Sequence, residues 1–158
     1  MTIEDLQKLF PNATKDTWHQ HPNGGGWVEN TAQVDDSSCV SGSARVYGSA
    51  QVFGYAWVSV SAHVYGSAHV SGSASVYGYA KVYEGEWVSS PLYLQGSKYS
   101  VCRCSKSNVM IGCEDHSIDE WLSRYSEIGR DNGYSEEEIE EYGLYLELFS
   151  EIIEKKSR

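Results

Sequence analysis

Valine occurs at every sixth position of this chain from residue 28 to residue 88, eleven times without a gap. Alanine stands four residues after eight of these valines, and glycine stands two residues after six of them. A period of six fits neither a helix of about 3.6 residues per turn nor a simple hairpin meander, and it predicts a solenoid whose coils each have three short sides. The series is Val28, Val34, Val40, Val46, Val52, Val58, Val64, Val70, Val76, Val82 and Val88.

The repeat also predicts which residues point inward. Alanine and valine two residues apart on a strand face the same side, so they form the interior, and the glycines let the chain bend at the corners. With three repeats per coil, residues eighteen apart stack on neighbouring strands about 4.8 Å apart. The sequence therefore predicts a mainly β protein with a short parallel β-helix of about three coils over residues 27–90.

Runs such as VYGSAQVFGYAWV and VYGSAHVSGSASVYGYAKV resemble the hexapeptide-repeat left-handed β-helix proteins. More narrowly, they are similar to repeats in uncharacterised bacterial and phage proteins. The resemblance implies a left-handed coil. In acyltransferases of this class a histidine between coils deprotonates the acceptor, a role that would belong to His63 or His69 here. Both occupy ordinary outward repeat positions, as Arg45 and Lys81 do, and the glycine that often follows the aliphatic residue in those enzymes is replaced by tyrosine, phenylalanine or serine.

One side of the predicted coil carries a column of outward tyrosines. Tyr47, Tyr65 and Tyr83 follow one another at intervals of eighteen residues, beside a partly cationic column that includes Arg45 and His63. Stacked like residues stabilise neighbouring strands, and tyrosines are also common at protein interfaces. The sequence leaves both interpretations open, so these five residues are candidate binding residues.

Residues 1–26 are predicted to form a cap helix and a glycine-rich loop. Thr2 and Asp5 provide a T-x-x-D helix start, followed by apolar residues that form one face as far as Phe10. The end of a solenoid exposes unpaired strand edges, and a helix in this place would cover them.

The glycine-rich loop has two interpretations. His19 and His21 lie close to three consecutive glycines, between Trp18 and Trp27. Such a loop could bind a metal or an anion through histidine nitrogens and bare backbone amides. No carboxylate or third histidine is nearby in sequence, so a flexible bend into the first coil is the preferred interpretation.

Residues 91–158 are predicted to form a small α+β appendage of order β-β-β-α-α. The six-residue period ends at Pro91, and alternating stretches at 92–94, 98–104 and 108–112 predict three short strands. Ser117 and Ser135 open two helices with capping-box patterns. The apolar stripes predicted for these helices are Ile118, Trp121, Leu122, Tyr125 and Ile128 in the first and Ile139, Tyr142, Leu146, Phe149 and Ile153 in the second.

Cys102, Cys104, Cys113 and His116 read C-x-C-x8-C-x2-H, four residues of zinc-ligand type within a short span. C-x-C on a strand places both thiols on one face. The spacing is not that of a standard zinc knuckle, however, and Cys104 could equally belong to a small core. No metal site is assigned from the sequence.

The negative charge of the chain is concentrated near its end. The formal net charge is −10, of which residues 114–158 contribute −9 with fourteen acidic and five basic side chains. Part of this is ordinary helix design, because acidic residues near a helix N-terminus favour the helix dipole. The exposed acids Glu137, Glu140, Glu141 and Glu147 are also candidate binding residues for a protein partner with a basic surface, and they disfavour direct binding of nucleic acid.

No nucleophile–base pair, phosphate-binding loop or carboxylate dyad emerges from the sequence. We therefore predict a non-catalytic, self-associating binding or inhibitor protein without a cofactor, forming a dimer or trimer. The C-terminal stretch IGCEDHSIDEWLSRYSEIGRDNGYSEEEIEEY is similar to segments that end several phage and prophage proteins. This likeness favours a phage-encoded protein acting on a host defence or nucleic-acid-handling protein. A hexapeptide-type acyltransferase and a small-molecule or nucleotide binder are the alternatives.

The location predicted from the sequence is cytoplasmic. Residues 1–10 lack the basic and apolar regions of a secretion signal, and no stretch reaches the about 20 apolar residues of a membrane span. Four cysteines without a disulfide-like framework fit a reducing compartment.

Overall fold

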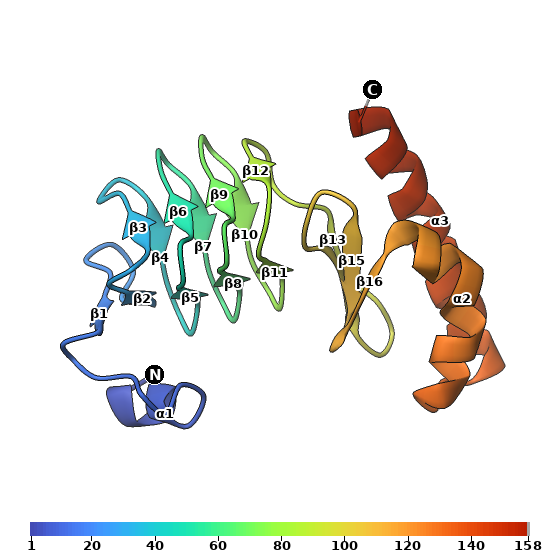
Figure 1. Cartoon of the computed structure of the whole chain (residues 1–158), viewed down its shortest axis with the longest axis horizontal. Helices are drawn as coiled ribbons and strands as arrows, with labels where there is room; N and C mark the ends of the chain where they lie inside the picture. Colours follow the sequence, from blue (N-terminus) through green and yellow to red (C-terminus); the bar gives the residue numbers. More distant parts are fainter. Residues whose placement is uncertain (158) are drawn as a thin grey trace. The chain divides into compact units, whose positions relative to one another are not determined.

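The computed structural model describes residues 1–157 and contains two compact units, Met1–Pro91 and Leu92–Arg158 (Figure 1). The first unit is a solenoid of about three turns built from stacked parallel strands, as the six-residue period predicts. The second unit is an antiparallel sheet followed by two helices.

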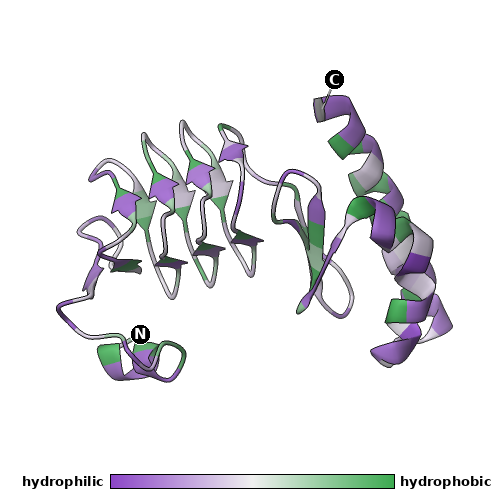
Figure 2. Cartoon of the chain, in the orientation of Figure 1, coloured by the Kyte–Doolittle hydropathy of each residue, from purple (hydrophilic) through white to green (hydrophobic). Residues whose placement is uncertain are grey.

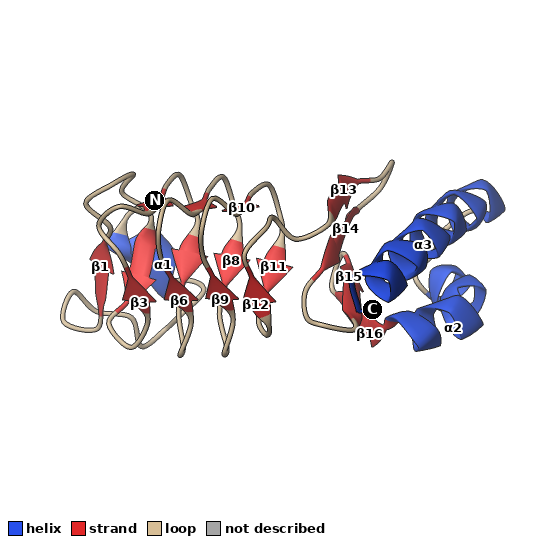
Figure 3. Cartoon of the chain, turned by 90° about the horizontal axis from the view of Figure 1, so that it is seen from above, coloured by secondary structure: helices blue, strands red, loops and turns tan. Residues whose placement is uncertain are grey.

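Three parallel sheets form the sides of the solenoid (Figure 3). The first side consists of β2 (Trp27–Glu29), β5 (Arg45–Val46), β8 (His63–Val64) and β11 (Lys81–Val82). The second side consists of β3 (Gln33–Val34), β6 (Gln51–Val52), β9 (His69–Val70) and β12 (Glu86–Trp87). The third side consists of β4 (Cys39–Val40), β7 (Trp57–Val58) and β10 (Ser75–Val76).

Valine and alanine fill the interior of the coils, as predicted. Val46, Val64 and Val82 pair in register along the first side, and each is fully buried. The alanines from Ala44 to Ala80 are also buried. Since most coils present the same two inward groups, the stack has a small core that is uniform over most of its length.

The register changes once, at the last coil. Val82 should be followed by an inward Val88, but Trp87 pairs with Val70 and is buried, whereas Val88 is exposed. The corner before β12 is one residue shorter than the others. The evidence is the hydrogen bond from His69 N, which is accepted by Gly85 and not by Glu86, the residue that the repeat would place there. The prediction of an inward Val88 is therefore wrong. A single deletion in the corner exchanges the inward and outward positions of every residue that follows it on the strand.

The corners of the solenoid require a left-handed backbone conformation. Six glycines two residues after valine have φ between 62° and 70°, a region that costs a residue with a Cβ atom about 1–2 kcal/mol. Val60 occupies the same corner position with φ 64° and is the one non-glycine residue with positive φ among the described residues. The glycines are Gly42, Gly48, Gly54, Gly66, Gly72 and Gly78.

The N-terminal segment contains helix α1 (Ile3–Gln7) and strand β1 (Trp18–Gln20). Thr2 and Asp5 form a reciprocal capping box at the start of the helix. Strand β1 pairs antiparallel with β2 along the edge of the first side, so the assignment of residues 18–20 to a loop is wrong. This pairing satisfies backbone groups that the first strand of a solenoid would otherwise expose.

The second unit begins with an antiparallel sheet of β13 (Tyr93–Gln95), β14 (Ser100–Arg103), β15 (Asn108–Ile111) and β16 (Glu114–Ser117). The first three strands agree with the alternation in the sequence, whereas β16 was not predicted. That strand reads EDHS and has no apolar residue, so alternation of hydrophobic residues could not reveal it. It joins the sheet through a turn at Gly112, which has φ 58°.

Helices α2 (Ile118–Asp131) and α3 (Glu136–Ser157) cover one face of this sheet. The predicted stripe of α3 is buried in full, and Phe149 and Leu146 are at its centre. In α2, Ile118, Trp121 and Ile128 are buried and Tyr125 packs at the margin, but Leu122 is exposed. The inclusion of Leu122 in the stripe is wrong because the core-facing arc of α2 is narrower than predicted.

Among the described residues, no helix combines the length and the apolar character needed to cross a membrane.

Candidate binding surfaces

The three tyrosines predicted to form a column do stack along the first side of the solenoid. The rings of Tyr47 and Tyr65 lie 5.0 Å apart and nearly parallel, with an interplanar angle of 8°. Tyr65 and Tyr83 lie 5.7 Å apart and are tilted by 43°. We call these three residues the aromatic ladder. Only the first of these two contacts is face to face, and all three side chains are half-buried.

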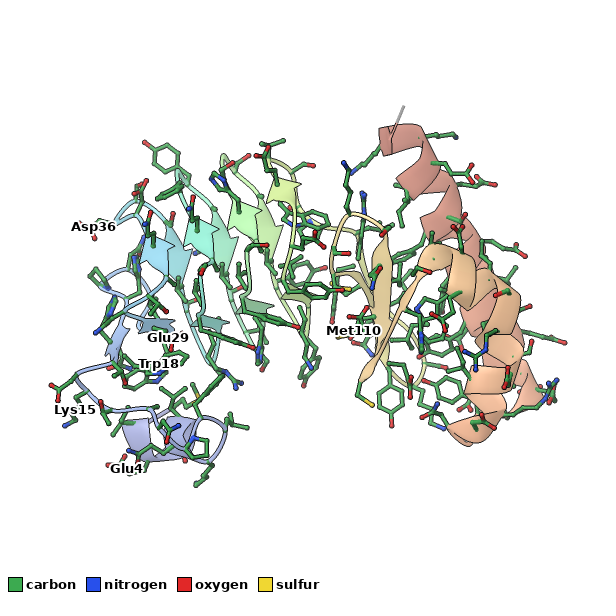
Figure 4. The ribbon with its side chains drawn as sticks, viewed as in Figure 1. Glu4, Lys15, Trp18, Glu29, Asp36 and Met110 are labelled. Carbon is green, nitrogen blue, oxygen red and sulfur yellow. The ribbon has the colours of Figure 1, made fainter. Side chains whose placement is uncertain are left out.

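The N-terminal segment closes the first end of the aromatic ladder. Phe10 meets Tyr47 edge-on at 5.0 Å, and Trp18 lies 6.1 Å from the same ring. Trp18 is placed between α1 and β2 (Figure 4), in a buried cluster that includes Leu6 and Trp27. These contacts make the ladder part of the packing of the first unit, in agreement with the stabilising interpretation of the tyrosine column.

The cationic column beside the ladder is partly withdrawn from solvent. Arg45 is buried, donates from Nε to the carbonyl of Ser43 at 3.2 Å, and has a pKa lowered by burial. The pKa of His63 is lowered to about 4, mainly by burial and then by the positive charges of Arg45 and Lys81. Burial likewise raises the pKa of Tyr47 to about 12, with a smaller contribution from Tyr65.

This environment is unfavourable for general-base catalysis by His63. A histidine with a pKa near 4 is neutral at pH 7 but is a weak proton acceptor. Its Nδ1 lies 3.3 Å from the hydroxyl of Tyr47, a group that is itself held protonated. His69, the other histidine of the acyltransferase alternative, lies on the second side of the solenoid and contacts Phe53 edge-on at 5.4 Å.

The third side of the solenoid carries an exposed aromatic surface that was not predicted from the sequence. Tyr55 is 82% exposed and Trp57 is 55% exposed, and Tyr77 and Tyr79 are exposed one coil further along. Val60, the corner residue with positive φ, is 55% exposed. We call these five residues the neutral aromatic face. The sequence does contain a sign of this surface. Its aromatic residues do not recur eighteen residues later, so no like residue stacks on them in the next coil.

In the second unit, helix α3 exposes two leucines on the side opposite its buried stripe. Leu144 is 65% exposed and Leu148 is 46% exposed. They lie four residues apart, so their side chains are neighbours on the helix surface. Figure 2 shows how hydrophilic and hydrophobic residues alternate along this helix. The acids that share this side by spacing and exposure are Glu137, Glu140, Glu147 and Glu151. We call these six residues the acidic leucine face.

Glu141 does not belong to this face, so its prediction as a binding residue alongside the other acids is not supported by its position. Its carboxylate accepts a hydrogen bond from the backbone N–H of Ser97 at 2.9 Å and another from the Ser97 hydroxyl. The hydroxyl of Tyr145 also donates to it, at 2.6 Å. Hydrogen bonds from Ser97, followed by that from Tyr145, lower the pKa of Glu141. Glu141 therefore ties α3 to the turn between β13 and β14.

The residues of zinc-ligand type are not gathered around one point. Cys102 is buried on the sheet, the Cys104 thiol lies 3.5 Å from Asp115, and Cys113 is exposed. His116 is held by two carboxylates, with Nε2 3.0 Å from Glu114 and Nδ1 3.3 Å from Glu120. Over residues 1–157 no cluster of three or more histidine, cysteine or acidic side chains has an arrangement suited to a metal ion.

The histidines of the glycine-rich loop have different environments. His19 is exposed and contacts Asn30, whereas His21 is buried. The Nδ1 of His21 accepts a hydrogen bond from the backbone N–H of Asn23 at 3.2 Å, and its Nε2 donates to the carbonyl of Asp35 at 3.1 Å. Both nitrogens of His21 are thus used in holding the loop against the first coil.

Comparison of the chain with models of protein families, with curated proteins and with solved structures finds no match.

Proposed function

We propose that this protein is a non-catalytic binding protein that engages a basic protein surface through the acidic leucine face of α3. The observation that carries the proposal is the pair of exposed leucines in the middle of an otherwise acidic helix surface. An exposed apolar pair contributes binding energy only when a partner covers it, and the surrounding carboxylates select a partner of opposite charge. On the strength of the sequence resemblance, the proposal includes an inhibitory, phage-encoded role against a host protein and a left-handed solenoid. The proposed cytoplasmic location rests on the sequence features and cysteine usage described above.

The charge of the helix supports the choice of a basic partner. Residues 136–157 contain eight acidic and two basic side chains, and both lysines lie in the last turn. Acidic residues in the first turn also stabilise the helix through its dipole. Glu140, Glu147 and Glu151 lie beyond the first turn, so this effect does not account for them.

Self-association is proposed as a second property. Mass measurement of the purified chain over a range of concentrations tests it, with a dimer or trimer expected. A monomer at every concentration would contradict this part of the proposal without affecting the first.

The main test compares capture of binding partners from a bacterial lysate by the wild-type chain and by designed variants. Leu144→Ser with Leu148→Ser should abolish capture of the principal partner, because the apolar contact is lost. Glu137, Glu140, Glu147 and Glu151 changed to glutamine should weaken capture about tenfold or more, and the wild-type interaction should weaken as salt rises past physiological ionic strength.

A matched control removes the same number of exposed charges from the first unit. Its changes are Asp16→Asn, Asp36→Asn, Glu84→Gln and Glu86→Gln, and capture should be unchanged. Circular dichroism should show equal helix content in all variants. The proposal fails if the α3 variants retain the partner, or if the control set loses it to the same extent.

A further inference from the structure

The neutral aromatic face on the third side of the solenoid is almost free of charge. The three segments that form this side with its corners, residues 36–44, 54–62 and 72–80, contain a single charged residue, Asp36. Aromatic rings, hydroxyl groups and small side chains make up the rest of the outward positions. A surface without ionic groups offers no favourable pairing to a strongly charged ligand and no strong repulsion to a neutral one.

Trp57 is the centre of this surface and lies between small residues along the stack. Its neighbours on the adjacent rungs are Cys39 on β4 and Ser75 on β10, both small residues. The flanking corner positions hold Tyr55 before β7 and Val60 after it. Because no aromatic residue stands above or below Trp57, the indole ring can receive a ligand ring.

The remaining outward groups of this side are mostly hydroxyls. Serines stand at positions 37, 41, 43, 59, 61, 73 and 75, and the phenol of Tyr55 adds another hydroxyl. A hydroxyl both donates and accepts hydrogen bonds, so it suits ligands whose own groups are hydroxyls.

The size of the surface favours a small ligand over a second protein subunit. Three rungs about 4.8 Å apart, each with a strand and its corners about 20 Å wide, give an area on the order of 300 Å². A stable protein interface buries about 800 Å² on each partner. The face is therefore too small to hold two copies of the chain together unaided.

We infer that the neutral aromatic face binds an uncharged carbohydrate chain. Sugar rings would stack their C–H faces on Trp57 and Tyr55, and their hydroxyls would exchange hydrogen bonds with the serines. Val60 supports the use of this surface, since a β-branched side chain is kept exposed at a corner where glycine would be unstrained. This inference does not depend on the proposed function, which concerns a helix of the other unit.

The test measures binding of the full-length chain to a panel of immobilised neutral oligosaccharides and their carboxylated or sulfated counterparts. The panel contains glucose, mannose, galactose and N-acetylglucosamine chains of six units. We expect the protein to bind at least one neutral chain with a Kd below about 1 mM. Trp57→Ala should weaken this binding about tenfold, and Trp57→Phe should weaken it less because a ring remains.

The control variant is Leu9→Ala, which removes an apolar side chain of similar exposure at a different place in the first unit. It should bind as the wild type does, and all variants should keep the wild-type melting temperature. Three results would overturn the inference: no neutral chain bound, equal binding by Trp57→Ala, or preference for the charged counterparts. Loss of a captured protein partner on Trp57→Ala, without glycan binding by the wild type, would instead identify a protein-docking surface.

Discussion

The first and third sides of the solenoid are built on the same six-residue repeat, yet they use aromatic side chains in opposite ways. On the first side, tyrosines recur at intervals of eighteen residues, so Tyr47 and Tyr65 stack at 5.0 Å and cover each other. On the third side, Trp57 stands between Cys39 and Ser75, and the residue is 55% exposed.

The difference shows that the repeat leaves its outward positions free to take different roles. Inward positions are small and nearly uniform because neighbouring coils share one core, with Trp87 in the last coil as the exception. Within the stack, outward positions are constrained mainly by their neighbours one coil above and below. Tyrosines repeated on successive coils of the first side pack against one another, whereas Trp57, which has no aromatic partner on the adjacent strands, remains exposed.

The largest expected effect comes from breaking the register that both sides share. Inserting one residue between Val58 and Val64 moves every later inward residue of the coil to an outward position, so we expect loss of cooperative unfolding in urea. Ser61→Ala in the same corner should leave the unfolding midpoint nearly unchanged. A cooperative transition in the insertion variant at the wild-type midpoint would show that the coils do not share one register.

The second prediction compares the two sides directly. Tyr65→Ala removes the middle ring of the aromatic ladder and should lower the free energy of unfolding by about 2 kcal/mol. Trp57→Ala removes a larger ring from the third side and should change it by less than about 0.5 kcal/mol. Urea denaturation of both variants provides the measurement. Equal losses would mean that the third side also contributes to packing.

The third prediction concerns the pH dependence of the free energy of unfolding. Of the two sides compared, the first should contribute to it, through His63. The pKa of His63 is lowered to about 4 in the folded state, mainly by burial and then by Arg45 and Lys81, and is near 6.5 in the unfolded chain. Between these values the unfolded chain binds a proton that the folded chain does not. Stability should therefore fall as pH is lowered from about 6.5 to about 4, by about 1–2 kcal/mol once solvent screening is allowed for.

His63→Gln removes this titration, so the loss of stability across the window should be smaller in the variant. Denaturant unfolding at pH 7, 5.5 and 4.5 gives the comparison. The same fall in both proteins would assign the pH dependence to other groups.

The smallest expected effect tests the strained corner of the third side. Val60→Gly relieves a positive φ and should raise the free energy of unfolding by about 0.5–1 kcal/mol, after the extra flexibility of glycine in the unfolded chain is subtracted. The matched change, Gly42→Ala, introduces the same strain in the same corner of the coil before. A Cβ atom there would also lie 3.1 Å from the carbonyl oxygen of Val60.

Gly42→Ala should therefore lower stability, and melting of the two variants under identical conditions would detect the opposite signs. If Val60→Gly is also destabilising, the isopropyl group contributes packing that outweighs its strain.

Much of the fold could be predicted from the sequence because it repeats. The inward valines and alanines, the corner glycines and the pairing of residues eighteen apart follow from a period that only a three-sided coil satisfies. The buried stripe of α3 follows in the same way from three- and four-residue spacing. In each case the same spacing of apolar residues recurs many times, so one residue that departs from it does not hide the pattern.

Other features depend on contacts between residues distant in the sequence. Trp87 replaces Val88 in the core because a corner loses one residue, which only the hydrogen bonding of the last coil reveals. Glu141 reads as one more acid of an acidic helix, but the turn at Ser97 binds its carboxylate. For both residues, neighbours in space rather than in sequence decide the role.

The sequence by itself determined a three-sided coil of valine and alanine, because burial of one repeated pair of side chains leaves few other arrangements. Only the tertiary structure decided which outward residues are packing and which are surface. Tyr47 is covered because α1 and Trp18 fold back over it, and Trp57 is exposed because its neighbours on the adjacent coils are small. Exposure is a property of what lies beside a residue in space, and a repeat does not encode it.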